Sequence, residues 1–356
     1  MENELSRRAF LVKGTAGLAM FPGVVQVANG VKNKIRIGQI GIGHAHASKL
    51  SVYRDSPDYE VVGIVEPEAE LRGKLGNQPP YRDLKWMSQE ELLNQPGLQA
   101  VLVETKVRDS LGVAQACIAA GMHIHIDKPA GDSLTKLLEI LNAAEKRNLL
   151  VQMGYMYRYH PAILLLKQFL REGWLGDVFE IHTVMSKVVD AVARVELAQY
   201  PGGIMFELGC HILDLVVDIL GEPKVVTPFA QHVAGPDDSL VDNMLAVLEY
   251  PEALATVKSS AQEVEGFARR HFVVCGTEGT FHIQPLDDPK AQVALAQSRG
   301  EYRKGYQEIM FPKFERYVAD AADMAKIIRG EKKSDFSYAH DLAVQRTLFK
   351  SCRLTS

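Results

Sequence analysis

Short apolar runs alternate with amphipathic stretches over the first part of the chain. The apolar runs, rich in Ile and Val, fall at residues 34–40, 60–65, 98–103, 122–126 and 149–153, and the helical patterns between them fall at 88–95, 110–120 and 133–146. Strands separated by helices of this length predict a parallel, doubly wound sheet. Ligands bind at the carboxyl edge of such a sheet, so the residues that follow the strands are the first candidates for chemistry.

The pattern changes beyond Gly154, where an aromatic-rich link leads into an amphipathic helix over residues 162–172. The later runs with strand character, which mostly lack helices between them, are 179–188, 243–250, 253–260, 271–274 and 280–284, and two helices, 314–328 and 338–350, complete the chain. This pattern predicts a mainly antiparallel sheet. We therefore expect a first domain over 31–153 and a second α/β domain over 154–356, whose last helix could pack back on the first domain.

A glycine turn directly follows the first strand. Gly41 permits a tight turn, and Gly43 lets a pyrophosphate approach the backbone where a helical pattern begins. Ile42 and His44 complete the turn, so we expect these four residues to contact a dinucleotide. The third position of the dinucleotide fingerprint is His46, where Gly or Ala is usual.

Two further residues at the ends of strands suit a nucleotide. Glu66 ends the second strand, about twenty residues after the glycines, where a carboxylate can bind the ribose hydroxyls of adenosine and repel a ribose phosphate. NAD is therefore favoured over NADP, unless Arg72 folds back over the pocket. Thr105 follows the 98–103 strand and could line a nicotinamide pocket, with ordinary turn chemistry as the alternative.

The sequence Asp127-Lys128-Pro129 ends the strand at 122–126 abruptly. Proline disfavours the helical conformation in the residue before it, so Lys128 should lie at the carboxyl end of that strand. The lysine is either part of a site, in which case we expect Asp127, Lys128 and Pro129 to contact the dinucleotide, or a surface lysine in an ordinary strand-to-helix turn.

A second polar group lies on an almost wholly apolar helix over residues 204–220, which glycines bracket. Glu207, His211 and Asp214 occupy positions i, i+4 and i+7, so they form one stripe. The stripe could line a site, could be a solvated face, or could hold a core histidine satisfied by its helix neighbours. As a site, it would let Glu207 orient His211 and raise its basicity, which suits removal of a hydroxyl proton.

Composition narrows the class of protein. The 356 residues are 47% hydrophobic and 24% charged, with a net charge of −4 and no basic cluster for nucleic acid, so a small molecule is the expected partner. Four cysteines lie far apart without a C-x-x-C pair and should be buried small hydrophobes. Glu207 and His211 could ligate a metal with His160 or His182, but no second ligand pair has metal-site spacing, so no metal is expected.

The amino terminus carries a different signal. Arg7 and Arg8 precede a broken apolar run over residues 16–28, which resembles a twin-arginine export signal and predicts a periplasmic protein. The run is too short and too broken to span a bilayer. We assign residues 1–30 to this segment, with a basic tail on a cytoplasmic enzyme as the alternative.

Together these motifs resemble the Gfo/Idh/MocA oxidoreductases over nearly the whole chain after residue 33. The matching motifs are the glycine turn Gly41-Ile42-Gly43, the Glu-Lys-Pro motif at Asp127-Lys128-Pro129, the aromatic and arginine motif at Gly154-Tyr155, Arg158-Tyr159 and Pro161, and the Asp-x-x-x-His dyad at Glu207 and His211 with Asp214 following. The resemblance implies a Rossmann domain and a second α/β domain whose open antiparallel sheet often mediates oligomerisation, here as a homodimer or homotetramer. It also implies NAD(P)-dependent hydride transfer on sugars, polyols or related alcohols. Three positions depart from the family pattern: Glu207 for aspartate, Asp127 for glutamate, and Lys106 where proline usually follows a threonine.

On this resemblance we hypothesise that His211 takes the proton of a substrate hydroxyl while Lys128 stabilises the alkoxide. Tyr155, Arg158 and Asp214 are the predicted substrate contacts. Export would favour a tightly held NAD and a redox-neutral cycle, either sugar dismutation or glycoside cleavage by oxidation, elimination, water addition and re-reduction. A non-catalytic sugar or nucleotide sensor is the remaining alternative, although a sensor needs no general base.

Overall fold

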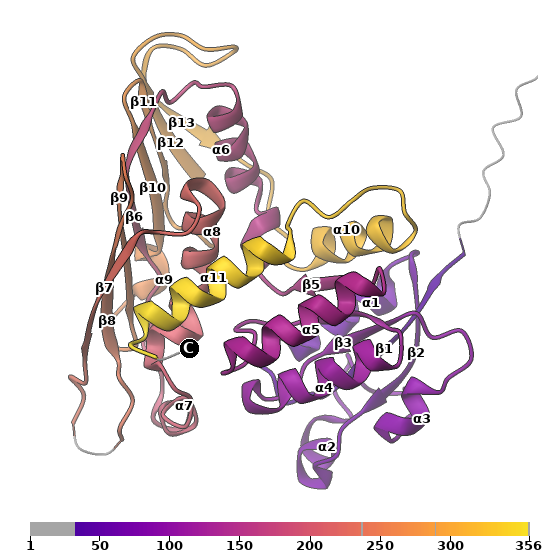
Figure 1. The fold of residues 1–356 in the computed structure, drawn as a ribbon. Coiled ribbons are helices and arrows are strands. Elements are labelled where there is room, and N and C mark those ends of the chain that lie inside the picture. Colours follow the sequence, from indigo (N-terminus) through magenta and orange to yellow (C-terminus); the bar gives the residue numbers. More distant parts are fainter. Residues whose placement is uncertain (1–32, 236–237, 289, 355–356) are drawn as a thin grey trace, which may run out of the picture. The chain divides into compact units, whose positions relative to one another are not determined.

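The computed structural model describes residues 33–235, 238–288 and 290–354 (Figure 1). The chain divides into two units, Met1–Asn33 and Lys34–Ser356, and the elements described below belong to the second. The predicted export segment, residues 1–30, lies outside the described residues. No helix within the described ranges has both the length and the apolar character that crossing a bilayer requires.

The first strands of the described chain form a parallel sheet in the order β2-β1-β3-β4-β5. Its strands are β1 (Ile35–Ile40), β2 (Tyr59–Val65), β3 (Ala100–Val103), β4 (His123–Ile126) and β5 (Val151–Met153), connected by helices α1 (Leu50–Asp55), α2 (Ala69–Leu75), α3 (Gln89–Leu93), α4 (Val107–Ala119) and α5 (Leu134–Lys146). Val101 and Val103 enter one hydrophobic cluster, while Ala100 and Leu102 enter another, because successive side chains of a strand face opposite sides of the sheet. Burial on both faces explains the continuous apolar runs, and the predicted doubly wound sheet is confirmed.

The second sheet has the order β13-β12-β11-β10-β6-β9-β8-β7, and only β6 and β9 among its neighbouring strands are parallel in the described residues. Its strands are β6 (Val178–Val184), β7 (Val225–Gln231), β8 (Asn243–Glu249), β9 (Leu254–Ser260), β10 (His271–Gly276), β11 (Gly279–Ile283), β12 (Lys290–Leu295) and β13 (Gly305–Met310). This confirms the mainly antiparallel sheet. Strands β7, β12 and β13 have no counterpart among the predicted runs; β7 and β13 are the edges of the sheet and bury little of either face.

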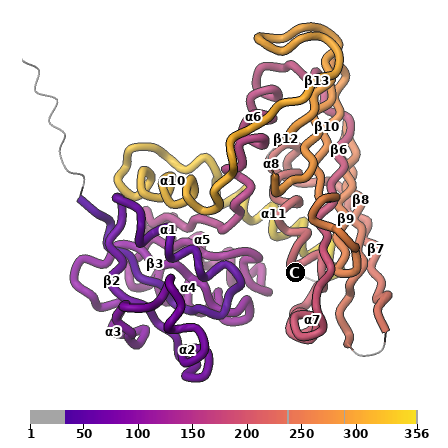
Figure 2. Tube along the Cα trace, turned by 180° about the vertical axis from the view of Figure 1, so that it is seen from behind, coloured from indigo at the N-terminus to yellow at the C-terminus, as the bar shows by residue number. Residues whose placement is uncertain are grey.

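Helices α6 (Pro161–Arg171) and α8 (Cys210–Leu220) lie against one face of this second sheet (Figure 1). Helix α11 (Tyr338–Ser351) packs on α8 and also on α5, while α10 (Val318–Ile328) lies beside α1 (Figure 2). Two tyrosines bond these last helices to the parallel sheet. The hydroxyl of Tyr59, on β2, donates to Ala321 O of α10 at 2.7 Å, and the hydroxyl of Tyr338, on α11, accepts from Val151 N of β5 at 3.1 Å. The final helices therefore fasten the parallel sheet to the second one. Shorter elements, η1 (Ala47–Lys49), η2 (Met156–Tyr159), α7 (Ala191–Leu197) and α9 (Gly266–Arg269), complete the described chain.

The helix predicted over residues 204–220 consists of two elements. A π-helical turn, η3 (Met205–Gly209), comes first, and α8 begins at Cys210. A π turn closes its hydrogen bonds over one more residue than an α-helix, so positions four apart are no longer stacked as they are in an α-helix. The predicted stripe of Glu207, His211 and Asp214 begins inside this turn.

Candidate active site

The glycine turn closes against the end of β3. Gly41 has φ +94°, and a Cβ at this position would lie 2.6 Å from Thr105 N, so no other residue fits without moving the backbone. Gln39, which is fully buried, donates its side-chain amide to Gly41 O at 2.9 Å and to Ala47 O at 3.3 Å. The Gln39 side chain therefore holds both ends of the loop that connects Gly41 and Ala47.

A cavity of about 560 Å³ opens beside this turn, and its lining includes Gly41, Gly43, Glu66 and Thr105. The Glu66 carboxylate accepts hydrogen bonds from Ile42 N and from Glu68 N, both at 2.9 Å. The buried Thr105 hydroxyl has no partner among the described residues. A glycine cradle, an oriented carboxylate and a free hydroxyl around a cavity of ligand size fit a dinucleotide.

Arg72 lines the same cavity and lies over Trp86, with the guanidinium carbon 6.0 Å from the ring centroid. The sequence favours NAD unless Arg72 lies over the pocket, and the structure does place the Arg72 guanidinium beside it, so binding of NADP is also compatible with this pocket. The Glu66 carboxylate still lies where the ribose hydroxyls of NAD bind.

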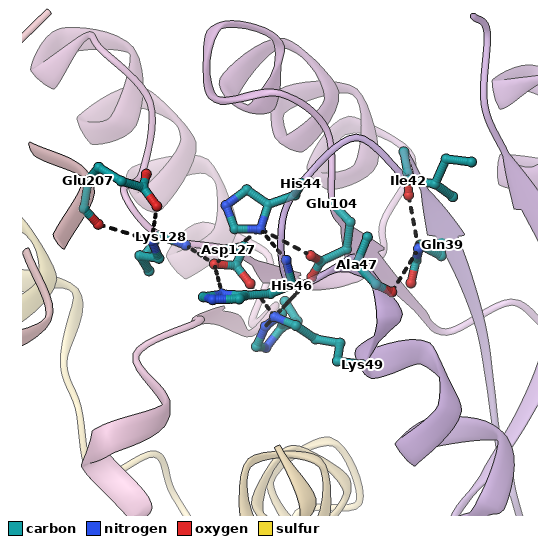
Figure 3. Close-up of polar contacts among 12 residues, drawn as sticks. Gln39, Ile42, His44, His46, Ala47, Lys49, Glu104, Asp127, Lys128 and Glu207 are labelled. Atoms are coloured by element: carbon teal, nitrogen blue, oxygen red, sulfur yellow. Dashed lines mark hydrogen bonds and ion pairs between the residues drawn. The ribbon is translucent and has the colours of Figure 1, made fainter. Parts of the chain in front are cut away.

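The helical pattern that follows His46 in the sequence forms the 3₁₀ turn η1 from Ala47, which continues directly into the six residues of α1. His44 N donates to Glu104 O at 3.1 Å. Residues 42–46 therefore form a loop between β1 and the helical residues that begin at Ala47. The loop turns His44 and His46 toward the end of β4 (Figure 3).

Asp127 is the residue on which this edge of the sheet converges (Figure 3). Its Oδ1 accepts the Lys128 backbone N–H at 2.7 Å and lies 3.2 Å from His46 Nδ1, while Oδ2 pairs with Lys49 Nζ. Burial alone would raise the pKa of Asp127, but His44, Lys49 and His46 hold it well below its usual range. Asp127 is therefore an anion that fixes the position of the lysine after it.

Lys49 lies buried under Asp127. Its ammonium is 3.0 Å from Glu104 Oε1 and 2.9 Å from His125 Nε2. Burial would lower the pKa of Lys49, yet Asp127 and Glu104 raise it above its usual value. Because the ammonium donates to Nε2 of His125, the ring proton of that histidine is on Nδ1, which donates to Gln152 Oε1 at 3.0 Å.

The Lys128 ammonium donates to Glu207 O at 3.0 Å and to Glu207 Oε1 at 2.9 Å. The prediction that Glu207 orients His211 is therefore wrong, because the π-helical turn directs this carboxylate to the lysine. Burial would lower the pKa of Lys128, but Glu207 raises it, so the side chain is a cation.

His211 is buried, and its Nδ1 has no partner among the described residues. Its ring lies 5.3 Å from the Tyr157 ring, 6.2 Å from the Tyr155 ring and 6.2 Å from the His46 ring. Burial lowers the pKa of His211 well below 6.5, and Lys128 lowers it further, so the expected increase in basicity does not occur. His211 is a neutral imidazole with a free nitrogen, near the cationic end of Lys128.

Two family models match this chain. The model described as "Oxidoreductase family, NAD-binding Rossmann fold" matches residues 35–155, and the GFO/IDH/MocA C-terminal domain matches residues 163–282, together more than half of the sequence. The chain belongs to the GFO/IDH/MocA oxidoreductase family. The predicted family, enzyme class and NAD-binding first domain are thereby confirmed.

Named members of the GFO/IDH/MocA family show a similar relation over most of this chain. The myo-inositol 2-dehydrogenase of Thermotoga maritima is 25% identical over 282 residues, which is 76% of this chain and 81% of that protein. The trans-1,2-dihydrobenzene-1,2-diol dehydrogenase of Macaca fuscata fuscata is 25% identical over 223 residues, 61% of this chain and 65% of that protein. An Agrobacterium radiobacter oxidoreductase solved with NAD+, L-tartaric acid and magnesium has a TM-score of 0.77 at 17% identity, covering 90% of this chain and 97% of its own, and shows the shared fold.

Two of the residues predicted to touch substrate belong to a buried ion-pair network in this GFO/IDH/MocA protein. Arg158 donates through Nε to Asp214 Oδ2 at 2.9 Å and through Nη2 to Asp341 Oδ1 at 2.7 Å, and all three side chains are buried. The guanidinium also lies over the Phe336 ring at 3.9 Å. This network joins η2, α8 and α11, so Arg158 and Asp214 are engaged with each other and with Asp341, and their contact with a substrate stays a prediction. Tyr155 stays a prediction, since its buried hydroxyl has no partner among the described residues.

Sequence reasoning missed Lys49, Glu104, His125 and the chemical role of His46. Glu104 directly follows β3 at the carboxyl edge, so the rule that selected Thr105 could also have selected it. Lys49 and His125 gave no local signal, because a lysine beside a short helix and a histidine within a strand are common at solvated positions.

Proposed function

We propose that this protein oxidises a secondary alcohol of a carbohydrate or polyol, with the hydride passing to the nicotinamide of NAD. The observation that carries the proposal is the pairing of a neutral, unpartnered imidazole at His211 with a buried ammonium at Lys128, on the carboxyl edge of an NAD-binding sheet. The names of the relatives support the substrate class, because they denote dehydrogenases of a cyclic polyol and of a dihydrodiol.

The chain supplies the proton chemistry of this reaction. NAD, when bound, accepts the hydride from the carbinol carbon. His211 removes the hydroxyl proton, since its ring is neutral at pH 7. Lys128, held by Glu207, places a positive charge where the alkoxide develops. Glu66 and Thr105 would hold the adenosine and nicotinamide ends of the cofactor.

A second candidate is redox-neutral glycoside cleavage, in which oxidation to a ketone acidifies the neighbouring C–H. One observation favours it: His46 and Asp127 form a histidine–carboxylate pair, with Nδ1 and Oδ1 3.2 Å apart, and the His46 ring is 6.2 Å from the His211 ring. A simple dehydrogenase needs one base, whereas elimination also needs a group that removes the proton of the adjacent carbon. An export route would suit this cycle, because the nicotinamide is restored within each turnover.

The test is the absorbance of reduced nicotinamide after adding sugars, polyols and glycosides to the purified protein. We expect His211→Ala and Lys128→Met each to retain NAD and to lose at least about 10²-fold in hydride transfer. The control is His232→Ala, an exposed histidine that bonds only backbone carbonyls in the described residues. Unchanged turnover in both site variants would overturn the proposal. Release of aglycone without net reduction, lost in His46→Gln, would select the second candidate.

A further inference from the structure

Outside the catalytic edge, three residues with different ligand atoms meet on the second sheet. Glu180 and His182 are two apart on β6 and so face the same side, and Cys275 pairs with Glu180 across the antiparallel β6–β10 ladder. Their ligand atoms all lie within 4.8 Å of one another. Ile181 and Thr183, between and beyond them, are buried on the side of α8, so the three-residue cluster lies on the opposite face.

We propose that Glu180, His182 and Cys275 form a binding site for a divalent zinc-class ion. This inference is independent of the proposed function.

The spacing suits such an ion. With Zn–N and Zn–O of about 2.0–2.2 Å and Zn–S of about 2.3 Å, ligand atoms on one tetrahedral ion lie about 3.3–3.8 Å apart. His182 Nε2 and Glu180 Oε1 are 3.5 Å apart, inside that range. At the 4.8 Å limit, Cys275 Sγ and the other two ligand atoms must approach by about 1.0–1.5 Å, through rotation about the side-chain bonds of the three residues. Three protein ligands leave a fourth position for water.

Two of the three ligands, Glu180 and His182, are uncommitted, whereas the Cys275 thiol bonds the Thr280 side chain on the neighbouring strand. Among the described residues, Glu180 and His182 contact only each other as an ion pair, and no lysine or arginine competes for the carboxylate. Cys275 is partly exposed, whereas Cys117, Cys210 and Cys352, the other cysteines of the sequence, are buried. A thiolate, an imidazole and a carboxylate together select zinc or cobalt over magnesium or calcium.

The other groupings of metal-binding residues in the described chain fail this test. His44, His46 and Asp127 form one, and Glu104, His125 and Asp127 form another. Both share Asp127, whose oxygens already hold Lys49 and the Lys128 backbone N–H. A cation there would have to displace an ammonium, so the cluster on β6 and β10 is the better site.

The experiment is a titration of the full-length, reduced, chelator-treated protein with Co²⁺ and then Zn²⁺. We expect one equivalent of Co²⁺ to give the d–d spectrum of a tetrahedral site with a thiolate-to-cobalt charge-transfer band, which Zn²⁺ abolishes by displacement. Cys275→Ser should remove the charge-transfer band, and His182→Ala should weaken binding at least about 10-fold. Mg²⁺ should not compete.

His282→Ala is the matched control, because this histidine lies on the next strand and is bonded to Gln284 at 3.1 Å. It should bind Co²⁺ as the parent does. His182 is partly exposed, so its alanine variant should keep the circular dichroism spectrum of the parent even if the cysteine variant folds poorly. The proposal is overturned by the absence of saturable binding, by a Co²⁺ spectrum without the sulfur band, or by an equal loss in the His282 variant.

Discussion

Replacing Lys49 by Met removes the cation that two buried carboxylates share. Lys49 is 2% exposed and reaches Asp127, Glu104 and the acceptor nitrogen of His125. Met nearly fills the space of the lysine stem, so the loss is electrostatic rather than a cavity. Removing one partner of a buried ion pair costs about 3–5 kcal/mol of folding free energy. Asp127 keeps the Lys128 N–H and the His46 contact, so we expect about 3 kcal/mol near pH 6.

The deficit should grow with pH. Burial raises the pKa of Glu104 to about 8, although Lys49 opposes the rise. A carboxyl group with a raised folded-state pKa contributes stability that is present at acid pH and is lost as pH rises through that pKa. Without Lys49 the pKa of Glu104 rises further, so the variant goes on losing stability above pH 8 where the parent does not. The added deficit is at most about 1.4 kcal/mol per pH unit, which gives about 4 kcal/mol at pH 9.

The assay is urea unfolding at pH 6 and pH 9 in a Trp174→Phe background. Trp86 is then the only tryptophan of the sequence, and it bridges to β2 of the parallel sheet, so its fluorescence reports the part of the protein that contains Lys49. Lys74→Met, at an exposed lysine on α2, is the control and should be neutral. Adding Glu104→Gln to the Lys49 variant should abolish the growth of the deficit with pH. A deficit below 1 kcal/mol, or one that shrinks from pH 6 to pH 9, would refute the reasoning.

Two further variants test the ends of the site. Glu66→Ala should weaken NAD binding at least about 10-fold in calorimetry, because the variant loses both the acceptor for the ribose hydroxyls and the partner of Ile42 N. NADP binding should weaken less. An equal loss of affinity for both cofactors would count against a contact between Glu66 and the ribose. Arg158→Leu leaves Asp214 and Asp341 buried without their cation, so we expect the protein to lose about 3–5 kcal/mol of folding free energy. The loss is measured as a lower melting temperature. Arg158→Lys should recover only part of the lost stability, because lysine cannot form the same forked hydrogen bonds. A stable Arg158→Leu protein with altered substrate affinity would support the original prediction for this residue.

The parallel sheet could be predicted from sequence because its signal is local. Strands β1, β3 and β4 are buried almost completely on both faces, so their sequences are apolar runs, and polar or turn-forming residues follow each run. Edge strands such as β13 bury little, and their sequence, Gly305 to Met310, resembles that of a loop. Their place in the sheet comes from pairing with β12, which no local pattern encodes.

The residues of the site could be predicted better than their partners. The rule for strand ends located Lys128, and the search for polar groups on an apolar helix located His211. The partner assignment failed because spacing by four assumes an α-helix, and Glu207 lies in a π turn. The ion-pair partners of Arg158 were missed for another reason: Asp214 and Asp341 are 56 and 183 residues away, and only the tertiary fold brings them to the guanidinium.

The ionisable groups at the carboxyl edge of the parallel sheet are in contact with one another, and this arrangement bears on the basicity of His211. Lys49 stands between Glu104 and Asp127, and Asp127 and Glu207 flank the backbone and side chain of Lys128. Lys128 lowers the proton affinity of His211, which by itself would make a weak base. The same ammonium lowers the proton affinity of a substrate alkoxide, and what governs the transfer is the difference between the two affinities. In the proposed mechanism, a single cation that acts on both groups therefore keeps His211 neutral in the resting protein without removing the driving force for the proton transfer.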